Sequence, residues 1–219
     1  MPGCNNVIGL LDYGAGNLGS VARAVSSLGY QVKNIKTHSE MSSVEHLIFP
    51  GVGSAKQAML SLERMDLASP LKDYAASGRP LLGICVGMQV LGQWSAEGNV
   101  ECLGIFPYSV TRFDCHEPVP HMGWNSVRWN AQHSALNQGS FQLPDLANFY
   151  FVHSYAAFLS QDINALPFVL AESTYGGQTF CNFVARGNVW GSQCHIEKSG
   201  RAGLQFIANF LRSSGDKNA

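Results

Sequence analysis

In the segment Pro80-Leu81-Leu82-Gly83-Ile84-Cys85-Val86-Gly87-Met88-Gln89, an apolar run stops at a cysteine flanked by glycines, and this pattern indicates the fold. A Gly-x-Cys-x-Gly sequence between a buried strand and a helix is typical of a nucleophile elbow, a sharp turn at the carboxyl edge of a sheet. The thiol of Cys85 then lies over the first free N–H groups of the helix, whose partial positive charge favours a thiolate. A buried core cysteine is the alternative, but it needs neither a tight turn nor small neighbours. The stretch therefore predicts a cysteine nucleophile.

The composition is that of one α/β domain. The chain has 219 residues, of which 46% are hydrophobic and 13% charged, and its formal net charge is −1. We expect a single domain over residues 1–219 with a sizeable core, and no basic surface for nucleic acid or a membrane. Residues 1–6 carry no basic group, and the apolar segment 7–11 is too short for a signal core or a membrane span. We therefore expect a cytoplasmic protein.

The cysteines indicate neither a metal site nor a disulfide framework. Six of them stand at irregular spacings with no Cys-x-x-Cys pair, at positions 4, 85, 102, 115, 181 and 194. Neither a zinc ribbon nor a thioredoxin-type motif is indicated, so we expect reduced thiols and no metal or other cofactor.

Strands and helices alternate through the first half of the chain. Apolar periodicity and turn residues predict strands over residues 7–11, 31–35, 46–49 and 81–84, and helices over 17–28, 55–65 and after Pro70. This alternation predicts an α/β fold with an open, mostly parallel sheet and helices on both faces. Past Cys102, aromatic-rich antiparallel strands are predicted to join the sheet edge, over 126–129, 149–152, 168–172, 180–184 and 189–192. A helix over 201–211 closes the chain.

A glycine-rich turn, Gly14-Ala15-Gly16-Asn17-Leu18-Gly19, follows the first strand and matches the Gly-x-Gly-x-x-Gly pattern of dinucleotide-binding folds. Such folds hold the ribose with an acidic residue at the end of the second strand, where this chain reads Ile35-Lys36-Thr37-His38. A lysine suits a 2′-phosphate, so a dehydrogenase stays open at this point. The competing interpretation is a turn that lines a cleft.

The segment Trp190-Gly191-Ser192-Gln193-Cys194-His195-Ile196-Glu197-Lys198-Ser199 supplies a base at a second strand end. If its start is extended, residues two apart point the same way. The carboxylate of Glu197 then holds the imidazole of His195 in one tautomer, and the imidazole takes the thiol proton. A surface histidine beside a glutamate is the commoner case for such a pair, but the position at a strand end favours a catalytic dyad.

The other six histidines are weaker candidates for the base. His121 and His153 have no carboxylate two or three residues away to orient the ring. The remaining four lie in loop-like or strand-entry positions, where a solvated or merely hydrogen-bonded ring is expected, at His38, His46, His116 and His133.

A third strand end supplies donors for an oxyanion. The turn Pro50-Gly51-Val52-Gly53 offers backbone N–H groups, and the N–H of Val86 follows the nucleophile. Two such donors hold the negative oxygen that develops when a thiolate attacks a carbonyl carbon.

With Cys85, His195 and Glu197 in that order, the chain resembles the class I, or triad, glutamine amidotransferases over nearly its whole length. Within that superfamily, five motifs are similar to the glutaminase subunit of imidazole glycerol phosphate synthase. They are Asp12-Tyr13-Gly14-Ala15-Gly16-Asn17-Leu18, Pro50-Gly51-Val52-Gly53, Gly83-Ile84-Cys85-Val86-Gly87-Met88-Gln89, Pro120-His121-Met122-Gly123-Trp124-Asn125 and Tyr150-Phe151-Val152-His153-Ser154-Tyr155. The resemblance implies a flavodoxin-like glutamine amidotransferase domain, and the dinucleotide interpretation loses its support.

The resemblance implies a reaction at the thiol. Cys85 attacks the side-chain amide carbon of glutamine, expels ammonia and leaves a thioester that water hydrolyses to glutamate. His195 protonates the leaving ammonia and later activates the water, while Glu197 orients the ring. Positions that hold the glutamine in the family match Gln89, Ser154 and Tyr155.

The resemblance also implies a partner, a (β/α)8-barrel cyclase that forms a heterodimer with the glutaminase. In the family, ammonia passes through a tunnel in the cyclase, which makes imidazole glycerol phosphate and an aminoimidazole carboxamide ribotide in histidine biosynthesis. Positions that face the cyclase match Asn17, Trp124 and Lys198. The competing interpretation for Trp124 is an ordinary core tryptophan.

One departure from the family concerns the dyad. The family reads His-Pro-Glu-Lys after an aromatic residue, but here Cys194 precedes His195 and Ile196 replaces the proline. Proline fixes φ, so we expect a looser contact between His195 and Glu197. Three alternatives stay open: a paralogous glutaminase that feeds another synthase, such as one amidating a sugar for surface polysaccharide, a stand-alone cysteine hydrolase, and a catalytically idle binding subunit.

Overall fold

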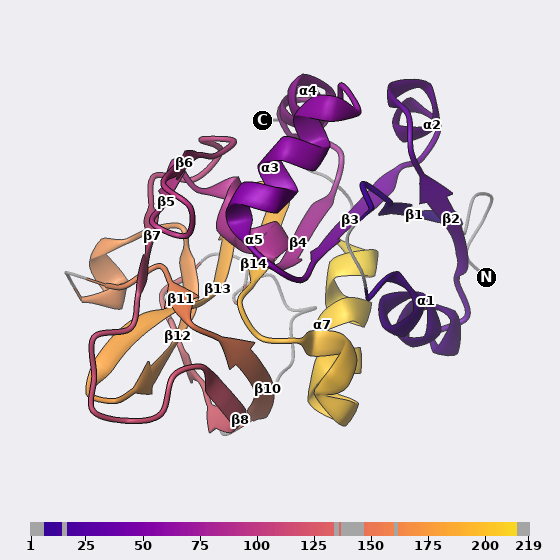
Figure 1. Ribbon diagram of the computed structural model, residues 1–219. Coiled ribbons are helices and arrows are strands. Elements are labelled where there is room, and N and C mark those ends of the chain that lie inside the picture. The colour runs from indigo at the N-terminus through magenta and orange to yellow at the C-terminus, as the bar shows by residue number, and fades with distance from the viewer. Residues whose placement is uncertain (1–6, 15–16, 134–135, 137–146, 160–161, 214–219) are drawn as a thin grey trace.

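The computed structural model of the protein describes residues 7–14, 17–133, 136, 147–159 and 162–213 (Figure 1). Its centre is an eight-stranded sheet with the strand order β2-β1-β3-β4-β14-β13-β12-β9. The first five strands run parallel to one another, and the last three are antiparallel to their neighbours. In chain order the strands are β1 (Val7–Leu11), β2 (Gln31–Ile35), β3 (His46–Gly51), β4 (Leu81–Cys85), β9 (Arg128–Trp129), β12 (Val169–Tyr175), β13 (Gln178–Arg186) and β14 (Val189–Ser192).

Helices cover both faces of this sheet. Helices α1 (Leu18–Ser27) and α7 (Gly200–Arg212) lie side by side on one face, and α3 (Ala55–Arg64) and α4 (Ala68–Ala76) lie on the other (Figure 1). The described part of the chain also contains the short helices α2 (His38–Ser42) and α5 (Val86–Leu91). The apolar stripe of α1 is buried against the sheet through Val21, Ala24 and Val25, as the helical spacing of its apolar residues predicts. The predicted α/β fold with a mostly parallel sheet is therefore confirmed.

Two smaller sheets stand beside the main one. One is the antiparallel pair β8 (His121–Ser126) and β10 (Asn148–His153), and the other has the order β11-β7-β5-β6. The strands of the second sheet are β5 (Trp94–Ser95), β6 (Val100–Glu101), β7 (Ser109–Arg112) and β11 (Tyr155–Ala156). Two 3₁₀ turns, η1 (Ile163–Ala165) and η2 (Ile196–Lys198), connect later elements.

The structure corrects three expectations about the elements. The strand predicted over 126–129 is two strands, because β8 ends at Ser126 and β9 begins at Arg128, with Val127 buried between them. The strand predicted over 149–152 pairs with β8 rather than with the edge of the main sheet. Helix α4 begins at Ala68, before Pro70, because the first turn of a helix needs no N–H from a proline.

None of the helices in the described part of the chain has the length and apolar character that a membrane span requires.

Candidate active site

Cys85 is the last residue of β4 and lies at the sharp turn into α5. Its backbone has φ 54° and ψ −111°, a conformation that a non-glycine residue adopts only under strain and that is typical of a nucleophile elbow. The flanking glycines make the turn possible. A Cβ on Gly87 would stand 1.9 Å from the carbonyl oxygen of Phe49, and one on Gly83 would stand 2.8 Å from the backbone of Gly87. The predicted elbow is thus present.

The register of the parallel strands brings three strand ends together at this elbow. Gly51 at the end of β3 pairs with Cys85, and Ser192 at the end of β14 pairs with Ile84. The chain that leaves β14 therefore passes directly beside the thiol. The oxyanion turn predicted at Gly51 and the base predicted after Ser192 consequently meet Cys85 at one edge of the sheet.

His195 and Glu197 form a hydrogen-bonded dyad. The distance from His195 Nδ1 to Glu197 Oε1 is 2.8 Å, and both side chains are buried. The contact does not arise from an extended segment, because Ile196, Glu197 and Lys198 form the 3₁₀ turn η2. The expectation of a looser contact at Ile196 was wrong, since 2.8 Å is a normal length for this hydrogen bond.

Asn17 also contacts the dyad. Its Nδ2 donates to Glu197 Oε1 at 2.5 Å, the same oxygen that accepts from His195. Asn17 precedes α1 and has a left-handed backbone with φ 78°. The glycine-rich turn thus ends on a residue that holds the carboxylate, while residues 15–16 of this turn lie outside the described part of the chain.

Opposing effects set the charge of His195. Burial alone would lower its pKa, but hydrogen bonds to Cys85 and Glu197, together with the negative charges of these partners, raise the pKa to about 10. Because Nδ1 faces the carboxylate, Nε2 is left for the thiol. The raised pKa favours the imidazolium form of the ring, which is the partner that stabilises a thiolate.

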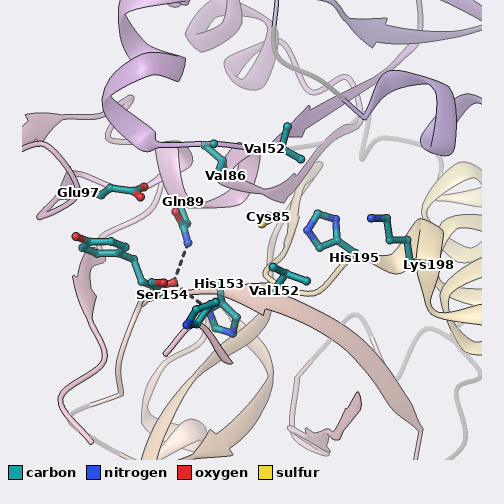
Figure 2. Close-up of a pocket in the computed structure, with 13 residues that line it drawn as sticks. Val52, Cys85, Val86, Gln89, Glu97, Val152, His153, Ser154, His195 and Lys198 are labelled. Atoms are coloured by element: carbon teal, nitrogen blue, oxygen red, sulfur yellow. Dashed lines mark hydrogen bonds between the residues drawn. The ribbon is translucent and has the colours of Figure 1, made fainter. Parts of the chain in front are cut away.

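A cavity of about 390 Å³ opens above this cluster. Figure 2 shows the ring of His195 beside Cys85, with Val52 and Val86 above them. Gln89 and Glu97 lie on the side of Cys85 opposite to His195. The cavity is lined by Val52, Gly53, Cys85, Val86, Gln89, Glu97, Pro120, Val152, His153, Ser154, Tyr155, His195 and Lys198. The predicted substrate residues thus line one cavity with the triad's cysteine and histidine, except that Gly51 lies behind it as the strand partner of Cys85.

Glu97 is an acidic residue of this cavity that the sequence analysis missed. Its carboxylate accepts a hydrogen bond from the N–H of Ala55 at 3.0 Å, and burial raises its pKa. No local pattern marks it, because Glu97 sits in a loop after β5 and reaches the cavity only through the tertiary fold.

Two amide side chains continue the polar cluster behind the thiol. Gln89 Nε2 donates to the carbonyl oxygen of Tyr155 at 2.8 Å and to Gln193 Oε1 at 3.0 Å. Gln193 Nε2 in turn donates to Cys85 Sγ at 3.8 Å. Gln193 is buried and was not among the predicted site residues.

A buried pair of histidines, His121 and His153, adjoins the cavity, and His153 lines it. His153 Nδ1 lies 2.9 Å from the carbonyl oxygen of Tyr155, and His153 Nε2 lies 3.0 Å from His121 Nδ1. Since a carbonyl only accepts, His153 donates from Nδ1 and accepts at Nε2, and His121 donates to it. His121 Nε2 then accepts from Asn125 Nδ2 at 3.4 Å. Two neutral rings satisfy every one of these contacts.

The three residues predicted to face a partner have different surroundings. Trp124 is 59% exposed, so the interpretation as a core tryptophan is wrong. Lys198 is exposed at the rim of the cavity. The side chain of Asn17 donates a hydrogen bond to Glu197 of the dyad.

No metal site is found within the described ranges, where no group of three or more His, Cys, Asp or Glu side chains is placed to hold an ion. The five cysteines in these ranges are free thiols, whereas Cys4 lies outside them.

A thiol on a strained elbow, a buried imidazole and a buried carboxylate lie together at the carboxyl edge of a parallel sheet. This arrangement is typical of enzymes with a Cys-His-Glu triad that form a thioester with their substrate. The comparisons with known proteins agree. The family model of the class I glutamine amidotransferases matches residues 9–213. A solved structure described as a glutamine amidotransferase superimposes with a TM-score of 0.70, at 17% identity, over 93% of this chain and 96% of the other.

Two curated relatives narrow the assignment. The imidazole glycerol phosphate synthase subunit HisH of Desulfitobacterium hafniense (strain DSM 10664 / DCB-2) is 44% identical over 93% of each chain. The chloroplastic imidazole glycerol phosphate synthase hisHF of Arabidopsis thaliana is 40% identical over 94% of this chain and 34% of that protein. The chain belongs to the class I glutamine amidotransferases and, among them, to the family of the imidazole glycerol phosphate synthase subunit HisH.

Proposed function

We propose that the protein is the glutaminase subunit of an imidazole glycerol phosphate synthase. It hydrolyses glutamine to glutamate and ammonia through a thioester on Cys85. The ammonia passes to a cyclase subunit that makes imidazole glycerol phosphate and aminoimidazole carboxamide ribotide in histidine biosynthesis. The observation that carries the proposal is the placement of His195 between Cys85 and the buried Glu197 at the floor of the cavity.

The triad residues act in two steps. The Cys85 thiolate attacks the amide carbon, and the N–H of Val86 with those of Val52 and Gly53 holds the oxyanion. His195 gives its Nε2 proton to the departing nitrogen, so ammonia leaves and a thioester remains. The neutral ring then takes a proton from water as the water attacks the thioester, and glutamate leaves as the thiolate re-forms. Glu197, held by Asn17, keeps the Nδ1 proton in place throughout.

The polar side chains of the cavity match the groups of glutamine. Gln89 uses both hydrogens of its amide on Tyr155 and Gln193, so its Oε1 is the atom left to accept a hydrogen bond from substrate. Glu97 supplies a carboxylate for the α-ammonium group of the amino acid. The backbone near Ser154 and Tyr155 lines the same wall.

An exposed apolar face beside the cavity supports a partner of the cyclase type. This β8–β10 face consists of Met122, Trp124, Tyr150 and Val152, in which Trp124 pairs with Tyr150 and Met122 with Val152. Met122 is 62% and Trp124 59% exposed, and apolar side chains gathered in this way mark a protein interface. Val152 also lines the cavity, so a partner docked here covers its mouth together with Lys198.

One glutamine amidotransferase domain over residues 1–219 and a cytoplasmic location belong to the same proposal. The family match over residues 9–213 supports the single domain. Free thiols at the five described cysteines fit the reducing environment of the cytoplasm.

The test mixes the protein with a histidine-pathway cyclase and measures glutamate release and nucleotide synthesis. We expect the cyclase and its nucleotide substrate to stimulate glutamate release. Cys85→Ala should abolish synthesis from glutamine while synthesis from added ammonia persists. Cys102→Ala is the matched control, since Cys102 is a buried thiol outside the cavity lining whose pKa burial raises to about 11. Loss of ammonia-dependent synthesis as well would indicate a structural role for Cys85.

The same assay decides among the alternatives. No stimulation by a histidine-pathway cyclase would favour a paralogous pathway. Peptide cleavage without glutaminase activity would favour a stand-alone cysteine hydrolase, and glutamine-dependent synthesis by Cys85→Ala would favour an idle binding subunit.

A further inference from the structure

The amide of Gln193 contacts the nucleophile without lining the cavity. The residue is 1% exposed and is not one of the residues that line the cavity. Its Nε2 lies 3.8 Å from Cys85 Sγ. Gln193 follows β14, and its backbone N–H is fixed by a hydrogen bond to the carbonyl oxygen of Asn182 at 2.8 Å. The contact with the sulfur is therefore built into the sheet edge.

The orientation of this amide follows from its neighbours. The carbonyl oxygen of Tyr155 only accepts, so the nitrogen of the Gln89 amide faces it at 2.8 Å. The second hydrogen of that nitrogen points to Gln193, which must present its oxygen, at 3.0 Å. Only the nitrogen of Gln193 is then left to face Cys85. One backbone carbonyl thus determines, through two amides, that the sulfur meets an N–H donor rather than an oxygen.

We propose that Gln193 is a second hydrogen-bond donor to the Cys85 thiolate, besides His195, and that Gln89 holds its amide in the donating orientation. A donor N–H stabilises a thiolate more than a thiol. A contact at 3.8 Å to sulfur also restricts where the thiolate points. The same Gln89 presents its Oε1 to the cavity, so one residue serves both the substrate and, through Gln193, the nucleophile.

This assignment rests on the proposed function for its meaning in catalysis, but its test needs neither glutamine nor a partner. The reaction of Cys85 with iodoacetamide is followed against pH, and the alkylated Cys85 peptide is quantified by mass spectrometry. The midpoint of that pH profile reports the thiolate population directly. A wild-type protein without glutaminase activity would refute the proposed function and leave this measurement intact.

Gln193→Met keeps the volume of the side chain and removes the donor. We expect its alkylation midpoint to rise by about one pH unit, which slows alkylation about tenfold below the midpoint. Gln89→Met should raise the midpoint by less, because the amide of Gln193 is retained but free to turn. Gln205→Met is the matched control, since Gln205 on α7 bonds Asn209 and lies outside the described lining of the cavity, and its midpoint should equal that of the wild type.

An unchanged midpoint in a folded Gln193→Met protein would overturn the proposal. If that variant does not fold, an unchanged midpoint in Gln89→Met would overturn it instead. A purely structural role for Gln193 would lower the melting temperature without moving the midpoint, so thermal unfolding is recorded for each variant beside the alkylation profile.

Discussion

Lowering the pH from 7 to 5 is expected to destabilise the protein by about 4 kcal/mol through the buried pair His121 and His153. Burial lowers the pKa of His121 from 6.5 to about 4. Burial, together with the positive charges that His121 and His195 carry when protonated, lowers the pKa of His153 to about 3, although the hydrogen bond to Tyr155 opposes the shift. The unfolded rings therefore gain protons in this pH range, while the folded rings stay neutral.

The magnitude follows from linkage. The folded pKa is depressed below the unfolded one, so the stabilisation is present above about pH 6.5 and is lost as the pH falls towards 4 and 3. A pH of 5 lies about 1.5 units below the pKa of 6.5 of each unfolded ring. At about 1.36 kcal/mol per unit, protonation of the unfolded state lowers the free energy of unfolding by about 2 kcal/mol per ring. This figure depends little on the folded values, provided both lie below about 5. His195, whose pKa is raised from 6.5 to about 10, has the opposite sign: its contribution is complete below about pH 6.5 and is lost as the pH rises towards 10. Only the interval from pH 7 to 6.5 overlaps this range, and there it changes the wild type and a His121/His153 variant alike.

The assay is urea unfolding at several pH values between 7 and 5, comparing the wild type with the double variant His121→Gln, His153→Gln. Glutamine supplies a neutral donor and acceptor at both positions. The double variant is expected to be less stable at pH 7 but to lose about 4 kcal/mol less between pH 7 and 5. His46 and His133 also have a lowered pKa through burial, and they add the same slope to both proteins. His38→Gln, at an exposed site on α2, is the control. Equal slopes in the wild type and the double variant would refute the reasoning.

Two further predictions concern the elbow and the dyad. Gly87→Ala places a Cβ 1.9 Å from the carbonyl oxygen of Phe49, so we expect a loss of several kcal/mol of stability in thermal unfolding; a melting temperature within about 2 °C of the wild type would contradict this. Glu197→Gln keeps the shape but removes the charge that helps to raise the pKa of His195 to about 10, so glutaminase kcat with the cyclase should fall by about 10² to 10⁴. A kcat within a factor of about three would show that the carboxylate only packs.

The elbow was predictable because its signal is local. Tight turns need glycine at defined places, so Gly83 and Gly87 on either side of Cys85 indicate the backbone before any tertiary contact is known. The same holds for β14, whose predicted range 189–192 matches the structure. The proximity of Cys85 and His195 then follows from parallel strands that end at one edge of the sheet.

The contacts that complete the site were not predictable, because they depend on the register between distant segments. Asn17 reaches Glu197 across 180 residues of sequence, and Gln193 reaches Gln89 across 104. The pairing of β10 with β8 has the same origin, since an alternating pattern predicts a strand but not its neighbour. Glutamine and asparagine side chains also carry no periodicity that would mark them as buried.

The substitution of Ile196 for the proline of the family shows how tertiary contacts replace a local restraint. Ile196 is the first residue of η2, a position where a helix needs no N–H and where proline serves only to fix φ. Here hydrogen bonds to Tyr150 and Ser199 hold the turn in place. The N–H of His195 donates to the carbonyl oxygen of Tyr150 at 2.8 Å, and Ser199 Oγ donates to the carbonyl oxygen of His195 at 2.7 Å while accepting from the N–H of Tyr150 at 3.0 Å.

These three hydrogen bonds tie both ends of the turn to one residue of β10, and Asn17 fixes the carboxylate from the start of α1. The side chain of Ile196 is fully buried, so the position contributes apolar packing instead of a fixed φ. The dyad keeps its 2.8 Å contact because its geometry is determined by neighbouring elements and not by the residue between His195 and Glu197. A change at this one position is therefore no sign of a different reaction.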